Sequence, residues 1–340
     1  MKMRIARILT VLLAGTFAVA GCRQPIPLSQ TAEILWTTCT ITIYDHAEKA
    51  SLDACFQRLR EIHARMSVNV PGSELDAIAA AAGKEPVRVT DDVLAVTKKA
   101  LQLAQLSGGL FDPTVGPLIK VWKINNEHPE VPKAADIAAA RALVNWRDVV
   151  VDEAAKTILL KRAGMELDLG GLVKGYAADE AVRILSARGV RSAIIDLGGD
   201  IFAMGRAQSG QAWRIGVQNP AAERGTYLGI AQVIDKTVVT SGVYEHFFMK
   251  NGKRYHHLMD TRTGYPVDNG LDSVTVITRS SMDADGFGLA LFCMGTEKGI
   301  QLGEKLDLGV VIVDAAHKVY VTPGTKAYFT ITDPSFTYAN

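Results

Sequence analysis

Residues 166–200, ELDLGGLVKGYAADEAVRILSARGVRSAIIDLGGD, contain two apolar runs, each of which ends in a glycine pair. The first run surrounds a carboxylate, Asp168, and reaches Gly170–Gly171, where the backbone can turn because there is no side chain to clash. The apolar residues that follow recur at helical spacing, and 193–197 is the second run. This pattern predicts a strand, a glycine turn, a helix, a second strand and a second glycine turn.

The first glycine turn has a possible chemical role as well as a structural one. Backbone N–H groups at the start of a helix attract anions, and Lys174 would add positive charge there. The GxxxxGK[ST] spacing of a Walker loop is absent. On the glycines alone, two tight turns in an α/β unit explain the pattern better, so both interpretations stay open.

Residues 1–22 have the pattern of an export signal. Basic residues precede an apolar run, 8–20, and small residues lead to Cys22. This run is shorter than the roughly 20 residues that a membrane-spanning helix needs. The small residues before Cys22 resemble a bacterial lipobox, in which the cysteine is acylated and becomes the mature N-terminus. An ordinary signal peptide with an incidental cysteine is the alternative.

The rest of the chain divides simply. Residues 23–31 contain two prolines and indicate a tether, and 32–340 are expected to form a single domain. We therefore expect a protein that is secreted across the inner membrane and held by its lipid on the periplasmic face of a bacterial envelope.

Composition limits the function classes. The 340 residues are 48% hydrophobic, ample for a large core, and carry a net charge of +1 without any basic run. Nucleic acid is therefore not an expected partner. Cys39, Cys55 and Cys293 are an odd number without metal-ligand spacing, which predicts buried thiols.

The periodic segments predict a mixed fold. Apolar spacing indicates a strand over 34–44, helices over 49–66, 91–106 and 281–294, and a hairpin over 149–160. Strands and helices alternate without a regular βαβ rhythm, which places the chain in the α+β class.

Three places contain residues that could carry chemistry. Asp112 lies in a stiff segment with two prolines, where a carboxylate could accept a ligand's N–H groups or cap the next turn. Asp285, in the first turn of an apolar helix, could bind a ligand or complement the helix dipole. His256 and His257 would point to opposite faces of a strand, so at most one enters a given site.

Eight segments of the chain are more informative together, in their order along the sequence, than any one of them is alone. They are MSVNVPGSEL (66–75), GLFDPTVGPL (109–118), ELDLGGLVKGYAADEA (166–181), IDLGGDIFAMG (195–205), WRIGVQNP (213–220), VTSGVYEHFF (239–248), RYHHLMDTRTGYPV (254–267) and MDADGFGLALFCMG (282–295). Together they resemble the ApbE-type FAD:protein FMN transferases, over nearly the whole chain after residue 22. A lipobox in front is typical of that family.

The resemblance implies a fold and a reaction. The fold would be an ApbE, T-fold-like architecture with FAD in a cleft between two intimately joined halves. Members cleave the FAD pyrophosphate with Mg²⁺ and release AMP, and for this chain Mn²⁺ stays open as the alternative metal. They pass FMN to a threonine or serine hydroxyl of an acceptor protein, which here would be a respiratory or redox flavoprotein subunit.

The resemblance also implies roles for individual residues. His257 would be a catalytic base, Lys174 would neutralise charge, and the Gly171 carbonyl and the Asp285 carboxylate would hold the metal. The residues expected to contact FAD are Trp36, Asn69, Leu110, Phe111, Asp112, Asp168, Lys174 and His257.

Two departures from the family pattern keep other functions open. Leu289 stands where the metal helix usually ends in a threonine hydroxyl, and Asp260–Thr261 replaces the usual Asp-Pro. Leu289 favours a flavin-binding lipoprotein without catalysis. Asn69, where others have tyrosine, would leave the flavin less covered and favours a Mg-dependent FAD pyrophosphatase that yields FMN and AMP.

Overall fold

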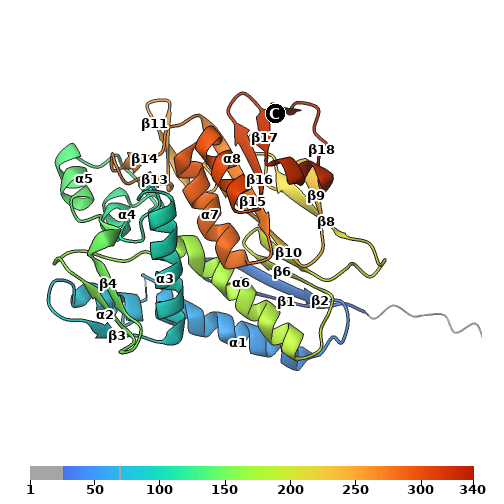
Figure 1. Cartoon of the computed structure of the whole chain (residues 1–340), viewed down its shortest axis with the longest axis horizontal. Coiled ribbons are helices and arrows are strands. Elements are labelled where there is room, and N and C mark those ends of the chain that lie inside the picture. The colour runs from blue at the N-terminus through green and yellow to red at the C-terminus, as the bar shows by residue number, and fades with distance from the viewer. Residues whose placement is uncertain (1–25, 69) are drawn as a thin grey trace, which may run out of the picture.

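A computed structural model describes residues 26–68 and 70–340 (Figure 1). Its helices are α1 (Lys49–Met66), α2 (Glu74–Ala80), α3 (Asp91–Leu106), α4 (Gly116–Trp122), α5 (Ala134–Arg141), α6 (Gly170–Ala187), α7 (Ser281–Met294) and α8 (Thr296–Lys305), with 3₁₀ turns η1 (Trp146–Asp148) and η2 (Pro323–Ala327).

The strands are β1 (Leu28–Ile34), β2 (Thr37–Ile43), β3 (Val87–Arg88), β4 (Val149–Asp152), β5 (Thr157–Leu160), β6 (Ala193–Leu197), β7 (Asp200–Met204), β8 (Trp213–Gln218), β9 (Tyr227–Val233), β10 (Lys236–Gly242), β11 (Phe247–Lys250), β12 (Lys253–His256), β13 (Met259–Asp260), β14 (Tyr265–Pro266), β15 (Leu271–Thr278), β16 (Gly309–Asp314), β17 (Lys318–Val321), β18 (Phe329–Ile331) and β19 (Thr337–Tyr338).

A nine-stranded sheet in the described residues organises the molecule, in the order β1-β2-β6-β7-β10-β15-β16-β17-β19. Helices α1, α6, α7 and α8 cover one face, and the small sheet β18-β9-β8 covers the other (Figure 1). Strand β16 shows why both faces are apolar. Val310 and Ile312 pack toward the helices, whereas Val311 and Val313 pack toward the small sheet, as the two-residue period of a strand requires.

A region beside the large sheet contains α2 to α5 and the sheet β3-β5-β4 (Figure 1). Helices α2 and α3 and strands β4 and β5 share the core of α1, α6 and α7, whereas α4 and α5 carry a small apolar cluster around Trp122, at the end of α4. The indole Nε1 of Trp122 donates to the Gly264 carbonyl at 2.7 Å, which ties α4 to the turn between β13 and β14.

Helices α6 and α7 pass unusually close to each other. A Cβ at Gly175 on α6 would lie 2.2 Å from the carbonyl oxygen of Ser281, so only glycine fits. Asp179, one turn further along α6, accepts hydrogen bonds from the amides of Ser281 and Met282 at 2.7 and 3.1 Å. Because those amides are otherwise unpaired at a helix start, Asp179 fixes where α7 begins.

Most of the predicted elements are confirmed. The helices 49–66, 91–106 and 281–294 have the predicted bounds, and β4 and β5 form the hairpin over 149–160. Mixed helices and strands confirm the α+β class. Cys39, Cys55 and Cys293 are buried free thiols, also as predicted. Among the described residues, no helix combines the length and the apolar character needed to cross a bilayer.

The strand predicted over 34–44 is confirmed for Thr37–Ile43, which form β2, but the prediction missed the turn before it. The structure has a hairpin there, with β1 and β2 joined at Leu35 and Trp36, which have φ values of 56° and 60°. Such turns normally carry glycine or asparagine, so this pair gave no turn signal. Strand β1 also includes residues 28–31, which the sequence analysis places in the tether. The alternation of polar and apolar residues in this segment is too weak to indicate a strand.

The strand predicted before Gly170 is absent from the structure, and Gly170 is the first residue of α6. The amide of Asp168 donates to the Pro113 carbonyl at 2.8 Å. Proline has no N–H group to return a bond, so Asp168 and Pro113 cannot exchange the two hydrogen bonds of an antiparallel pair.

Replacing Gly175 with alanine should destabilise the protein by about 1–3 kcal/mol, because the new methyl group meets backbone and the two helices must separate. Chemical denaturation measures this change. Gly324→Ala is the control, since a Cβ there meets nothing within 4 Å. Equal midpoints for the two variants would contradict the close packing of α6 and α7.

Candidate functional site

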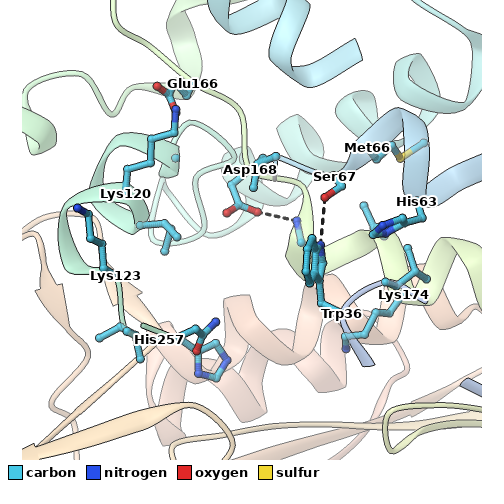
Figure 2. Close-up of a pocket in the computed structure, with 18 of the residues that line it drawn as sticks. Trp36, His63, Met66, Ser67, Lys120, Lys123, Glu166, Asp168, Lys174 and His257 are labelled. Atoms are coloured by element: carbon cyan, nitrogen blue, oxygen red, sulfur yellow. Dashed lines mark hydrogen bonds and ion pairs between the residues drawn. The ribbon is translucent and has the colours of Figure 1, made fainter. Parts of the chain in front are cut away.

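A pocket of about 500 Å³, within the usual range for small-molecule sites, opens beside the β1–β2 turn (Figure 2). The end of α1, helix α4, the start of α6 and the residue after β12 complete its wall. Four of the predicted site residues line it: Trp36, Asp168, Lys174 and His257. Other lining residues are Leu35, His63, Met66, Ser67, Val68, Gly116, Ile119, Lys120, Lys123, Ile124, Asn125, Asn126, Glu166, Gly170 and Val173.

Trp36 forms the wall on the hairpin side. Its side chain is 69% exposed, so little packing holds the ring in place. Its indole Nε1 donates to the Ser67 hydroxyl at 3.1 Å, and its ring meets that of His63 edge-on with centroids 5.7 Å apart. The indole is therefore held as a flat apolar surface at the mouth of the pocket (Figure 2).

The opposite wall carries charged side chains, two of which are paired with each other. Lys120 on α4 contacts Glu166 at 2.6 Å. Asp168 accepts a hydrogen bond from the amide of Gly170 at 2.7 Å, which satisfies one donor at the start of α6. Burial raises the pKa of the Asp168 carboxyl. The rest of the Asp168 carboxylate faces the pocket and can accept a hydrogen bond from a ligand (Figure 2).

Lys174 lies at the other end of the pocket, between two carboxylates. Its ammonium pairs with Asp200 at the start of β7 and lies 3.5 Å from Asp285 Oδ1 on α7. The other oxygen of Asp285 accepts from the amide of Gly175 at 3.1 Å. Burial opposes the charged ammonium, but Asp200 and Asp285 outweigh it and raise the pKa of Lys174, so this group stays charged.

A divalent cation fits this donor set. Asp200 and Asp285 are each 5% exposed, and one ammonium cannot neutralise both. Among the described residues no group of three or more His, Cys, Asp or Glu side chains gathers to hold a metal. A cation here would depend on Asp285, main-chain oxygens, water and ligand phosphate, the set that Mg²⁺ usually takes.

Gly171, the other predicted metal ligand, lies next to Leu289. A Cβ at Gly171 would be 3.0 Å from Leu289 Cδ2 and 3.6 Å from the ring of Phe111. The side chain of Leu289 therefore packs against Gly171. Its hydrocarbon side chain offers no oxygen.

The segment Leu110–Asp112 lies behind the pocket and not in its lining. Asp112 accepts from the amide and hydroxyl of Thr114, at 2.8 and 2.6 Å, and from the amide of Trp146 at 2.9 Å. Both carboxylate oxygens are used within the protein, so the geometry favours turn capping, one of the two roles that the sequence left open. Phe111, beside Gly171, supports the start of α6.

His257 follows β12 and enters the pocket, whereas His256 points into the core and its Nε2 contacts the Val267 carbonyl at 2.9 Å. The Nδ1 of His257 lies 3.3 Å from the His246 carbonyl, which can only accept. Nδ1 therefore carries the proton and Nε2 is free to accept one. Burial lowers the pKa of His257 to about 3, and the neighbouring His246 adds to this effect.

The sequence missed Asp200 and the side chains at the end of α1. Asp200 follows the second glycine pair directly, and a carboxylate at that point is a signal that could have found it. His63 and Ser67 carry no local signal, because only the folded hairpin brings Trp36 to them. Asn69 and Cys22, predicted for flavin contact and lipidation, lie outside the described residues.

Curated relatives resemble the chain over most of its length. It is 35% identical to a FAD:protein FMN transferase of Klebsiella pneumoniae (strain 342), covering 91% of this chain and 96% of that protein. It is 34% identical to a FAD:protein FMN transferase of Treponema pallidum (strain Nichols), covering 87% and 86%.

Solved structures agree with this result. The flavin transferase ApbE from Vibrio cholerae matches with a TM-score of 0.81 at 27% identity, covering 89% of this chain and 99% of that one. The ApbE protein from Thermotoga maritima matches with a TM-score of 0.83 at 27% identity and the same coverage. The ApbE family model matches residues 35–312. The resemblance seen in the eight segments is confirmed, and the chain belongs to the ApbE family.

Proposed function

We propose that this chain transfers FMN from FAD to a threonine or serine hydroxyl of an acceptor protein, with Mg²⁺, and releases AMP. The convergence of Trp36, Asp168, Lys174 and His257 on one pocket carries the proposal, because these residues come from three distant parts of the chain. The relatives named FAD:protein FMN transferase support it, since they align along almost their whole length.

The reaction is one displacement at phosphorus. The acceptor oxygen forms a bond to the phosphorus of the FMN half. The bond from that phosphorus to the bridging oxygen breaks, and AMP leaves with this oxygen. The hydroxyl proton moves to Nε2 of His257, which is free because Nδ1 donates to the His246 carbonyl. Bound diphosphate would raise the pKa of His257 toward neutrality and make it a stronger base.

The remaining residues bind and orient FAD. The indole of Trp36 offers a face for the flavin ring, and Asp168 accepts hydrogen bonds from the adenosine half. Lys174 would attract the diphosphate from its place beside Asp200 and Asp285. Asp285 and the Gly171 carbonyl would hold Mg²⁺, which supplies positive charge where negative charge develops on the leaving AMP.

We further propose that the chain is exported and held at the periplasmic face of the envelope by a lipid on Cys22, close to an acceptor that is a redox flavoprotein subunit. The lipobox pattern before Cys22 supports this proposal.

Asp285→Ala should abolish AMP release from FAD in the presence of Mg²⁺, because the buried carboxylate on the proposed metal is lost. Chromatography of the nucleotides measures this. Asp283→Ala is the matched control, since Asp283 contacts Lys99 at 2.6 Å and does not line the pocket. Equal turnover by the wild type and Asp285→Ala would refute the metal assignment.

A parallel incubation separates this function from its alternatives. The wild type is given FAD and Mg²⁺ with and without a threonine-bearing acceptor. Covalently yellow acceptor supports transfer. Free FMN without acceptor points to a pyrophosphatase, and unaltered bound FAD points to a flavin-binding lipoprotein without catalysis.

Leu289→Thr should tighten Mg²⁺ binding in the presence of FAD, on the order of tenfold, because the new hydroxyl faces the Gly171 end of the site. Isothermal titration calorimetry measures it. Leu289→Val has nearly the same shape as threonine without the oxygen and serves as the control. Identical affinities for the two variants would exclude a ligand position at residue 289.

His257 should remain neutral between pH 5 and 8 in the FAD-free protein, because a group is deprotonated above its pKa, here about 3. Histidine NMR signals, assigned with a His257→Gln variant, report this directly. Adding FAD should move the midpoint upward, since the diphosphate charge favours the protonated ring. A midpoint near 6.5 without FAD would overturn the description of His257 as neutral in the FAD-free protein.

Cys22→Ala should release the protein from the membrane fraction, because the proposed lipid anchor is attached to this cysteine. Fractionation and labelling with a radioactive fatty acid measure the effect. If the variant stays with the membranes and the wild type takes up no label, the lipid anchor does not exist.

A further inference from the structure

The ammonium of Lys174 is shared unequally between its two carboxylates. It makes a close ion pair with Asp200, whereas its distance to Asp285 Oδ1 is 3.5 Å. Charge-assisted hydrogen bonds between an ammonium and a carboxylate are normally about 2.7–2.9 Å long. Asp285 is therefore only loosely engaged by Lys174.

Asp285 itself is held in place from the other side. Its Oδ2 accepts the amide of Gly175 at 3.1 Å, and the close approach of α6 and α7 fixes that amide. Its Oδ1 is turned toward Lys174. A cation that binds Oδ1 would therefore meet a preoriented carboxylate. Among the described side chains, only the Lys174 ammonium competes with such a cation for Oδ1.

Asp200 decides how strong that competitor is. It is 5% exposed, and among the described residues its carboxylate contacts only the Lys174 ammonium. With Asp200 ionised, the ammonium has a close partner and need not approach Asp285. Without that charge, the nearest remaining carboxylate for the ammonium is Asp285, and a full ion pair there would occupy Oδ1.

We propose that Asp200 is a positioning residue, which holds the Lys174 ammonium away from Asp285 and so keeps Asp285 open for a divalent cation. This inference rests on the proposed function, in which Asp285 holds Mg²⁺. It adds that the lysine is an internal competitor of the metal and that Asp200 weakens this competition.

The test is a titration of the full chain with Mn²⁺, with and without FAD, in which electron paramagnetic resonance counts the free ion. Asp200→Asn keeps the shape of the side chain and removes its charge. Its dissociation constant for Mn²⁺ should rise at least about tenfold, because Lys174 then pairs with a buried Asp285. Lys174→Met should instead bind Mn²⁺ more tightly than the wild type, since the competitor is gone.

The double variant Asp200→Asn/Lys174→Met distinguishes positioning from direct ligation. If Asp200 acts through Lys174, removing the lysine restores Mn²⁺ affinity to within about threefold of the wild type. If Asp200 is itself a metal ligand, the double variant binds as weakly as Asp200→Asn, and the proposal is wrong. Asp196→Asn is the control for general charge effects, because Asp196 accepts from the Gly199 amide at 2.7 Å in the same glycine turn.

Asp285→Asn separates this proposal from the proposed function. If Asp285→Asn abolishes Mn²⁺ binding while Asp200→Asn and Lys174→Met leave it unchanged, only the positioning role fails. If Asp285→Asn binds Mn²⁺ as the wild type does, the metal site itself is misplaced and both proposals fail.

Discussion

The close crossing of α6 and α7 is the constraint on which the rest of the site depends. Gly175 lets the two helices meet backbone to backbone, and Asp179 binds the first amides of α7 so that their relative position is fixed. Because of this crossing, Lys174 and Asp285 lie within 3.5 Å of each other. A larger residue at position 175 would push α6 and α7 apart and so separate Lys174 from Asp285.

The crossing also concentrates charge where water is scarce. Asp200 and Asp285 are almost fully buried around a single ammonium. Burial raises the pKa of Asp200, with the charge of Asp285 adding to it against the opposing effect of Lys174. Buried charge without a full complement of opposite charge is costly, so such a cluster attracts a cation. Under the proposed function, a cation bound there would neutralise part of the negative charge of the FAD diphosphate.

The local elements of this fold could be predicted from spacing alone, and the turns could not. Helix α1 repeats its apolar residues at helical spacing over its 18 residues, so its existence follows from the order of residue types. The turn at Leu35–Trp36 has positive φ values without glycine or asparagine, and the hairpin was therefore missed. Asp112 shows the same limit, since its choice between a ligand and the Thr114 turn depends on neighbours in space.

The sequence by itself determined the class of fold, the family, and four residues of the pocket, because eight ordered segments leave little freedom for another assignment. Only the tertiary structure decided which carboxylates surround Lys174 and which side chains hold Trp36. Asp200, His63 and Ser67 come from separate elements, and their contacts depend on how helices and strands cross. Residue spacing records the period of one element, whereas the distance between two elements is set by what packs between them.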